Sequence, residues 1–328
     1  MAPAVVVPEA LRRRYLGTRD GRTWLADLPG LVEASLAAFG FIPDPPGAAP
    51  WHGHGALVLP VRSAGGSPAV LKFPFPHPEA ATEPAALALW DGKGAVRLLD
   101  RDAAGTCLVL ERLDAERTLL TVDMAAAAGV WGSLVRRLSL QESDSPHWAA
   151  VSSLAEHAEQ LSDELPAEWD ALGRPFERWL LEAALEVCQT RGAVGRRSAR
   201  DVLVHTDLHY ANILARPGLP DDYAAIDPQA VFGEAEYAVA PMLWNRLHDL
   251  DPAAPQDALL ERLERLCTAA GLDRQAALDW SVLREVTNAL DYVRDGQPGD
   301  AQRSVWVASA LTGRRHPGLP PVQELPAA

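Results

Sequence analysis

The chain has 328 residues, of which 48% are hydrophobic, and a formal net charge of −14. This length and apolar content suffice for one large or two medium domains with a full core. The negative charge argues against a nucleic-acid partner and is compatible with a cationic ligand. No run of about 18 apolar residues occurs, so no membrane span is predicted. The N-terminal charges follow a very short apolar run, the reverse of a secretory signal, which predicts a cytoplasmic location.

The first 45 residues or so predict helices, because apolar residues recur at helical spacing from Trp24 to Phe39 before Gly40 ends the run. A stretch rich in Pro and Gly follows. Two apolar runs, Ala56–Val61 and Ala69–Phe73, then predict a β-hairpin, since a short turn-forming segment joins them.

A loop that contains Gly53 and Gly55 precedes this hairpin, where a kinase fold covers the nucleotide phosphates. The third glycine of the usual phosphate-loop pattern is absent, and ordinary turns also use glycine. His52 and His54 in the same loop are an alternative metal pair, but no other ligand lies near them in the sequence. We therefore interpret the segment as a nucleotide loop.

Lys72 is one of only two lysines, with Lys93, and it sits inside an apolar strand. A strand of this kind carries the lysine that holds the α- and β-phosphates in kinases and pairs with a helix glutamate. Residues 78–90 predict the helix. Glu83 is the expected partner, although Pro84 follows it directly; either the helix begins at Pro84 or Glu79 makes the pair.

Residues 108–113 form an apolar run that ends in a polar turn, which predicts a hinge where the backbone of Glu111 and Leu113 reads the adenine edge. Most of the later chain has apolar residues at helical spacing. The predicted helices are 124–138, 151–165, 176–192 and further ones to about residue 311. The proline-rich end from Gly313 predicts a flexible tail.

Residues 202–229 contain the densest set of chemically useful side chains. Val202–Val204 and Tyr223–Ile226 predict short strands, with residues 213–215 between them and a turn at residues 217–222. A hairpin would bring together Asp207, Asn212 and Asp227. Phosphoryl transfer needs a carboxylate that orients the attacking hydroxyl, and an amide oxygen and a carboxylate that hold magnesium. We assign Asp207 to the first role and the other two to the second.

Two other interpretations of this stretch are open. His205, Asp207 and His209 alternate on one face of an extended segment and would suit a hydrolytic metal site, but no further ligand follows at short spacing. A polar turn in a core hairpin is the second possibility. It would not explain why Asn212 and Asp227 fall in register.

With these residues, the chain resembles the aminoglycoside phosphotransferases, in particular the branch of streptomycin 6-phosphotransferases and hydroxyurea resistance kinases. The resemblance extends from Trp24 to about Trp306. It implies an α+β, two-lobed, protein-kinase-like fold with a small antiparallel sheet lobe at residues 1–112, a helical lobe at 113–312 and a tail at 313–328. It also implies ATP and Mg²⁺ as cofactors. The most specific stretches are Ala69–Lys72, Leu89–Val96, Leu110–Leu113, His205–Asn212, and Ile226–Gln229 with Ala240–Asn245.

The resemblance places the family's catalytic aspartate on Asp207, its metal ligands on Asn212 and Asp227, and its nucleotide lysine on Lys72. One departure is Ala238, where family members commonly carry Asp. Two function classes follow: a small-molecule kinase, or a kinase-fold regulator that binds nucleotide without turnover.

Streptomycin is the expected acceptor. It carries two guanidinium groups, which bind best to paired carboxylates. Glu234 and Glu236 follow the metal aspartate closely, and Asp291 and Asp295 lie one helical turn apart, so these four residues are the predicted acceptor ligands. Any one of them is also readily explained as a solvated surface carboxylate. Hydroxyurea and other metabolite hydroxyls are the alternative acceptors.

Overall fold

The computed structural model describes residues 6–47, 49–77, 82–192, 199–219 and 221–326. They form two compact units. Unit 1 contains the chain up to Glu116 with two later segments, Ser145–Ala150 and Ala215–Gln229, and unit 2 contains the remainder. Two of the points at which the chain changes from one unit to the other fall inside short strands, β7 (Asp114–Thr118) and β10 (Ile213–Ala215).

Unit 1 is built on an antiparallel sheet of six strands with the order β1-β3-β4-β6-β5, and β2 also pairs with β3. The predicted hairpin is confirmed as β3 and β4, in which Val58 lies opposite Lys72. The strands are β1 (Phe41–Pro43), β2 (Trp51–His52), β3 (Ala56–Ser63), β4 (Pro68–Pro74), β5 (Leu98–Arg101) and β6 (Leu108–Glu111).

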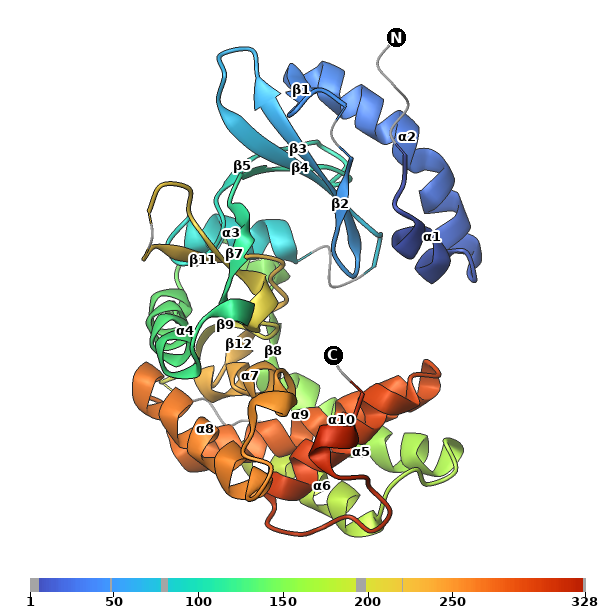
Figure 1. The fold of residues 1–328 in the computed structure, drawn as a ribbon, viewed down its shortest axis with the longest axis vertical. Coiled ribbons are helices and arrows are strands. Elements are labelled where there is room, and N and C mark those ends of the chain that lie inside the picture. The colour runs from blue at the N-terminus through green and yellow to red at the C-terminus, as the bar shows by residue number, and fades with distance from the viewer. Residues whose placement is uncertain (1–5, 48, 78–81, 193–198, 220, 327–328) are drawn as a thin grey trace. The chain divides into compact units, whose positions relative to one another are not determined.

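Two N-terminal helices, α1 (Glu9–Tyr15) and α2 (Arg19–Phe39), accompany this sheet (Figure 1). Trp24, Leu28 and Val32 recur every four residues on α2, so they share one face, and they belong to the same buried cluster as Leu57 and Leu71 of the sheet. The predicted N-terminal helices are therefore confirmed. Burial of these apolar side chains stabilises the attachment of α2 to the sheet.

Two features explain why residues 215–229 belong to unit 1. Ala225 of β11 (Tyr223–Ala225) forms a parallel bridge with Ala95. The guanidinium of Arg216 binds Glu111 at 3.0 Å and Asp222 at 3.2 Å. The predicted turn before β11 is closed by a 2.7 Å hydrogen bond from the Arg216 N–H to the Asp222 carbonyl.

Unit 2 is mainly helical, and α8, α9 and α10 lie together in it (Figure 1). Helix α4 approaches α8 so closely that a Cβ at Gly132 would lie 2.5 Å from the Ala269 backbone, which requires glycine there. The α-helices of this unit are α4 (Met124–Leu138), α5 (Leu154–Ala171), α6 (Arg178–Arg191), α7 (Ala240–Trp244), α8 (Pro255–Ala270), α9 (Arg274–Arg294) and α10 (Pro298–Leu311).

A small sheet lies among these helices, with the order β8-β12-β9. Strand β9 (Val202–His205) is antiparallel to β12 (Ala230–Gly233), and His205 lies opposite Ala230. Strand β8 (Ser152–Ser153) pairs with the other side of β12. A single-turn 3₁₀ helix, η5 (Ala235–Ala238), follows β12. The antiparallel sheet of unit 1 and the helices of unit 2 confirm the predicted α+β class.

The end of the chain differs from the flexible tail expected after Gly313. Val322 is only 3% exposed, and Leu325 is also buried. The Arg303 guanidinium donates to the Pro326 carbonyl at 2.7 Å, and the Arg314 guanidinium lies 4.3 Å from the centre of the Trp179 ring. The proline content suggested a loose segment, but its two apolar side chains provide enough buried surface to attach it.

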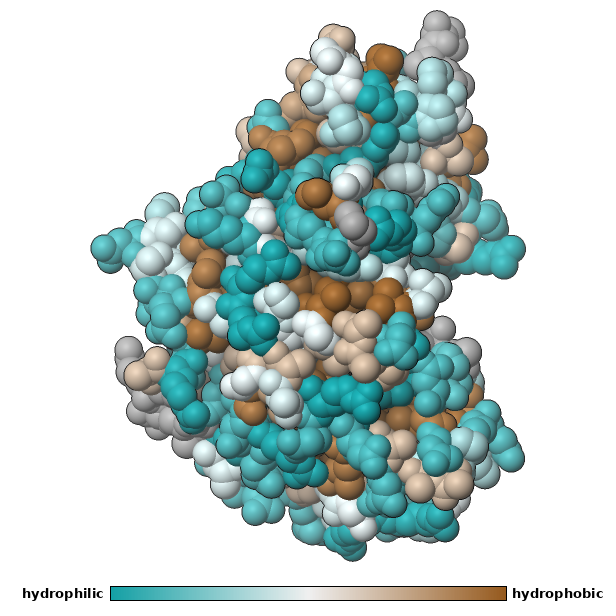
Figure 2. Space-filling model, turned by 60° about the vertical axis from the view of Figure 1, so that its left-hand side comes forward, coloured by the Kyte–Doolittle hydropathy of each residue, from teal (hydrophilic) through white to brown (hydrophobic). Residues whose placement is uncertain are grey.

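Hydrophilic residues cover most of the face of the molecule drawn in Figure 2. Large exposed hydrophobic side chains are few among the described residues, and Trp51 and Ile42 are two of them. In the described part of the chain, no helix combines the length and the apolar character that a membrane crossing requires.

Candidate functional site

The Lys72 ammonium is bound by two carboxylates in unit 1. It donates to Oε1 and Oε2 of Glu83, each at 2.7 Å, and to Oδ1 of Asp227 at 2.5 Å. The Lys72 and Glu83 side chains are 7% and 4% exposed, whereas the Asp227 side chain is 43% exposed. Lys72 and Glu83, which are 11 residues apart, therefore form one charged cluster with Asp227, which lies 155 residues from Lys72 and is partly exposed.

The start of α3 (Glu83–Trp90) explains how Glu83 is placed beside a proline. Pro84 lies in the first helical turn, where its missing N–H would have no partner within the helix in any case. Glu83 is the first residue of α3, as expected if the helix begins at this proline. Glu79, the alternative partner, lies outside the described residues.

The charge state of the cluster follows from its composition. Burial lowers the pKa of Lys72, but the carboxylates of Glu83 and Asp227 outweigh burial and raise this pKa above its ordinary value. The lysine is therefore a permanent cation at neutral pH. Asp227 has a left-handed backbone with φ of 56°, a conformation that Asp tolerates better than most residues and that often marks functional positions.

Asp207 and Asn212 lie together in unit 2, in the loop that follows β9. The Asn212 amide Nδ2 donates to the backbone carbonyl and to Oδ2 of Asp207, each at 3.0 Å. This orientation leaves Oδ1 as the Asn212 side-chain atom suited to a metal ion. The Asp207 side chain is 32% exposed, so it is accessible to solvent.

Oxygen atoms of Asn212 and Asp227 are ligands of the type that Mg²⁺ takes in sites where substrate phosphates complete the coordination. The alternative cluster of His205, Asp207 and His209 does not form a metal site. His205 is buried, and its Nδ1 accepts the Asp207 N–H at 3.2 Å. The described residues include no group of three or more His, Cys, Asp or Glu side chains arranged to hold a metal ion.

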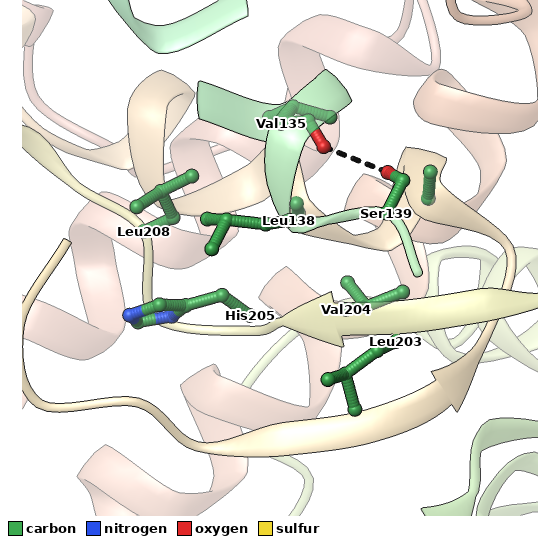
Figure 3. Close-up of a pocket in the computed structure, with 9 residues that line it drawn as sticks. Val135, Leu138, Ser139, Leu203, Val204, His205 and Leu208 are labelled. Carbon is green, nitrogen blue, oxygen red and sulfur yellow. Dashed lines mark hydrogen bonds between the residues drawn. The ribbon is translucent and has the colours of Figure 1, made fainter. Parts of the chain in front are cut away.

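A small cavity of about 10 Å³ lies between β9 and the C-terminal end of α4, with room for about one water molecule (Figure 3). His205, Leu138 and Leu208 line it, and so does Ala238. Ser139 beside it uses its hydroxyl to bind the Val135 carbonyl at 2.7 Å. The cavity is far too small for a substrate.

The predicted nucleotide loop joins β2 to β3. The Gly55 carbonyl accepts the Phe75 N–H at 2.7 Å. The Tyr15 hydroxyl from α1 donates to the His54 carbonyl at 3.4 Å, and the Tyr15 ring lies 4.4 Å from that of Phe75. The Gly53 N–H is bound by the Ala56 carbonyl at 3.1 Å. The support from Tyr15 was missed, because a tyrosine in an N-terminal helix gives no sequence signal for this contact.

The predicted adenine hinge lies at the end of β6. The Glu111 N–H donates to the Arg97 carbonyl at 3.0 Å, and the Glu111 carboxylate accepts the Arg97 N–H at 2.8 Å as well as the ion pair with Arg216. The Leu113 side chain is buried. These contacts fix the shape of the hinge; its role in adenine binding stays a prediction.

The predicted acceptor carboxylates divide into two pairs. Glu234 is buried and accepts the Trp280 indole N–H at 2.6 Å, and Glu236 accepts the Asp273 N–H at 3.0 Å, so both have partners within unit 2. Asp291 and Asp295 lie at the end of α9. Their side chains are 42% and 61% exposed.

Comparison with known proteins identifies the family. Residues 45–296 match the model of the aminoglycoside/hydroxyurea antibiotic resistance kinases. The chain is 35% identical over 316 residues to a streptomycin 6-kinase of Streptomyces glaucescens, an alignment that covers 94% of this chain and 98% of the relative. It is also 35% identical over 316 residues to a hydroxyurea phosphotransferase of Kitasatospora aureofaciens, covering 95% and 86%.

The fold agrees with this match. The structure of the amicoumacin kinase hAmiN, solved with AMP-PNP, Ca²⁺ and Ami, superposes with a TM-score of 0.57 at 13% identity, covering 90% of this chain and 95% of that one. The predicted kinase-like fold is thereby confirmed. The chain is a phosphotransferase that belongs to the aminoglycoside/hydroxyurea antibiotic resistance kinase family.

Proposed function

We propose that this phosphotransferase transfers the γ-phosphate of ATP, with Mg²⁺, to a hydroxyl group of streptomycin. The observation that carries the nucleotide part is the Lys72 ammonium bound by Glu83 and Asp227. In kinases a lysine in this position holds nucleotide phosphates, and an aspartate of this kind holds the metal ion. Two carboxylates on separate segments converge around this one buried cation, and such a cluster is weak evidence for a purely stabilising role.

The roles of the residues follow from their chemistry. Asp207 orients the acceptor hydroxyl and takes its proton as the oxygen bonds to the γ-phosphorus. The bond from the γ-phosphorus to the bridging oxygen breaks, and ADP leaves with that oxygen. Asn212 and Asp227 would hold the magnesium ion, which neutralises phosphate charge when it is bound. Lys72 balances the negative charge of the nucleotide.

The acceptor assignment rests on the relatives and on charge. One relative is a streptomycin 6-kinase, and a net charge of −14 attracts a dication. Among the predicted acceptor ligands, Asp291 and Asp295 are the exposed pair. The Arg294 guanidinium pairs with Asp291, so a guanidinium group of streptomycin would have to displace Arg294 to bind this carboxylate. Hydroxyurea is the second candidate, because a hydroxyurea phosphotransferase also has 35% identity to this chain.

The deciding experiment measures ADP release with streptomycin, hydroxyurea and kanamycin at matched concentrations, with Mg²⁺ present or removed by a chelator. We expect turnover with streptomycin that requires Mg²⁺, and a kcat/KM that falls as salt rises. Turnover with hydroxyurea but not with streptomycin would show that hydroxyurea is the acceptor and would leave the proposed kinase chemistry unchanged. Nucleotide binding without turnover of any acceptor would favour the regulator class.

A further inference from the structure

The backbone of the loop around Asp207 is held at four consecutive carbonyls. The Asp207 carbonyl accepts the Asn212 amide at 3.0 Å, and the Leu208 carbonyl accepts the Trp131 indole N–H at 3.1 Å. The His209 carbonyl accepts the Asn212 N–H at 3.0 Å. The fourth carbonyl, that of Thr206, accepts from the Arg284 guanidinium. All these partners belong to unit 2.

The Arg284 contact differs from the other three in charge. Arg284 lies on α9, 78 residues further along the chain, and it is the charged donor of the set. A hydrogen bond from a charged donor is stronger than one between neutral groups. It acts on the carbonyl of the peptide that joins Thr206 to Asp207, so it fixes the backbone directly before the catalytic carboxylate.

The position of Arg284 is itself fixed by aromatic packing. Its guanidinium lies 5.2 Å from the centre of the Tyr237 ring, within cation–π range. The Tyr237 ring meets the Trp280 ring edge to face at 5.5 Å, and Trp280 lies one turn before Arg284 on α9. The Trp280 indole is bound in turn by Glu234 at 2.6 Å. A chain of contacts thus links the interior of α9 to the catalytic loop.

We propose that Arg284 is a positioning residue that sets the orientation of the Asp207 carboxylate through the Thr206 carbonyl. This inference rests on the catalytic role proposed for Asp207. Loss of the guanidinium frees the peptide before Asp207 and lets the carboxylate move away from the acceptor hydroxyl. Since a displacement of about 1 Å costs about 10²-fold in rate, we expect kcat to fall by 10- to 100-fold. The KM for ATP stays within about twofold, because the residues proposed to hold the nucleotide phosphates are elsewhere.

The test compares Arg284→Met with Arg284→Lys, using the full chain. Methionine keeps a long side chain without a donor, and lysine keeps a charged donor without the planar guanidinium. Arg274→Met is the matched control, because Arg274 lies on the same helix in an exposed ion pair with Glu264. We expect the order of kcat to be wild type, then lysine, then methionine, with the control equal to wild type. A folded Arg284→Met variant with wild-type kcat would overturn the proposal.

Two further measurements cover the other outcomes. If Arg284→Met does not fold, Arg284→Lys decides; a kcat below that of Arg274→Met supports the proposal, and a kcat equal to that of this control contradicts it. If the wild type has no turnover with any acceptor, amide hydrogen exchange of residues 203–214 is compared between Arg284→Met and the control. Faster exchange in Arg284→Met supports the positioning role even when the proposed function fails, and equal exchange excludes it.

Discussion

Glu83 accepts the Lys72 ammonium through both of its carboxylate oxygens, each at 2.7 Å. Asp227 accepts the same ammonium at 2.5 Å. One cation is therefore shared between an acid that is almost fully buried and an acid that is partly exposed. Removal of the cation would leave a buried carboxylate without its charge partner.

Lys72→Ala should weaken ATP binding, lower turnover, or both, because the phosphates lose their cation. The chain offers a matched control, since Lys93 is the other lysine and is exposed. Lys93→Ala should behave as the wild type. The measurement is the steady-state kcat and the KM for ATP, with thermal unfolding to verify the fold. If kcat and the KM for ATP are the same in the two variants, Lys72 does not bind the nucleotide.

Asp207→Asn should lower kcat by roughly 10²-fold or more while nucleotide binding is retained. The asparagine keeps an oxygen that can accept the Asn212 amide, so the loop should keep its shape. Asp221→Asn, in an exposed turn, is the control. Calorimetry with ATP and Mg²⁺ separates binding from turnover. A kcat equal to that of the wild type would exclude Asp207 as the catalytic base.

Glu234→Ala should lower the free energy of unfolding by about 2–4 kcal/mol, because the Trp280 indole and the Arg191 guanidinium lose a buried partner. Glu236→Ala removes one backbone contact near the surface and should cost about 1 kcal/mol or less. Urea unfolding measures both. The KM for streptomycin should not change. A raised KM with unchanged stability in Glu234→Ala would instead make this residue an acceptor ligand.

The stability of the protein should fall as pH rises from about 5 to 8, because of one buried carboxyl on α9. Burial raises the pKa of Glu285 to about 8, and Ser304, Arg284 and Arg303 only partly oppose this rise. The folded protein therefore keeps a proton that the unfolded chain releases near pH 4.5, so the folded state binds more protons between these values. The stabilising contribution is complete below pH 4.5 and is lost as pH passes through 8.

Glu285→Gln should remove this dependence, because the amide cannot ionise. At about 1.4 kcal/mol per pKa unit, the variant should gain a few kcal/mol relative to the wild type between pH 5 and pH 9. Glu261→Gln, on an exposed face of α8, is the control and should follow the wild type. Urea unfolding across this pH range measures the difference. Parallel pH profiles for the wild type and Glu285→Gln would show that Glu285 ionises normally.

Periodicity and turn chemistry predicted the local elements well. The helix at residues 124–138 and the hairpin of β3 and β4 follow from apolar spacing and from the turn between them. The partner of β9 was not predicted, because residues 230–233 form a short run with no pattern of their own. Their conformation depends on the β9 edge that they cover, which is a tertiary effect.

Side-chain partners were predictable only where a family pattern specified them. Lys72 and Glu83 belong to such a pattern. The contact of Arg284 with Thr206 joins residues that are 78 positions apart, and no local sequence pattern indicates it. The buried partners of Glu234 likewise could not be predicted from the sequence. Its charge suggested a surface ligand, but the structure provides Trp280 and Arg191 as buried partners.

The near absence of lysine makes the chain a selective target for amine-reactive reagents. Apart from the N-terminal amine, only two primary amines exist, and the exposed Lys93 should react first. Lys72 is buried and held as a cation by two carboxylates, so its acylation requires the cluster to open and release a proton. In a Lys93→Arg variant, mass spectrometry would measure the rate at which Lys72 is labelled. That rate would report how often the cluster of Lys72, Glu83 and Asp227 opens. ATP that occupies the site should slow that rate, which provides a record of nucleotide binding that needs no acceptor.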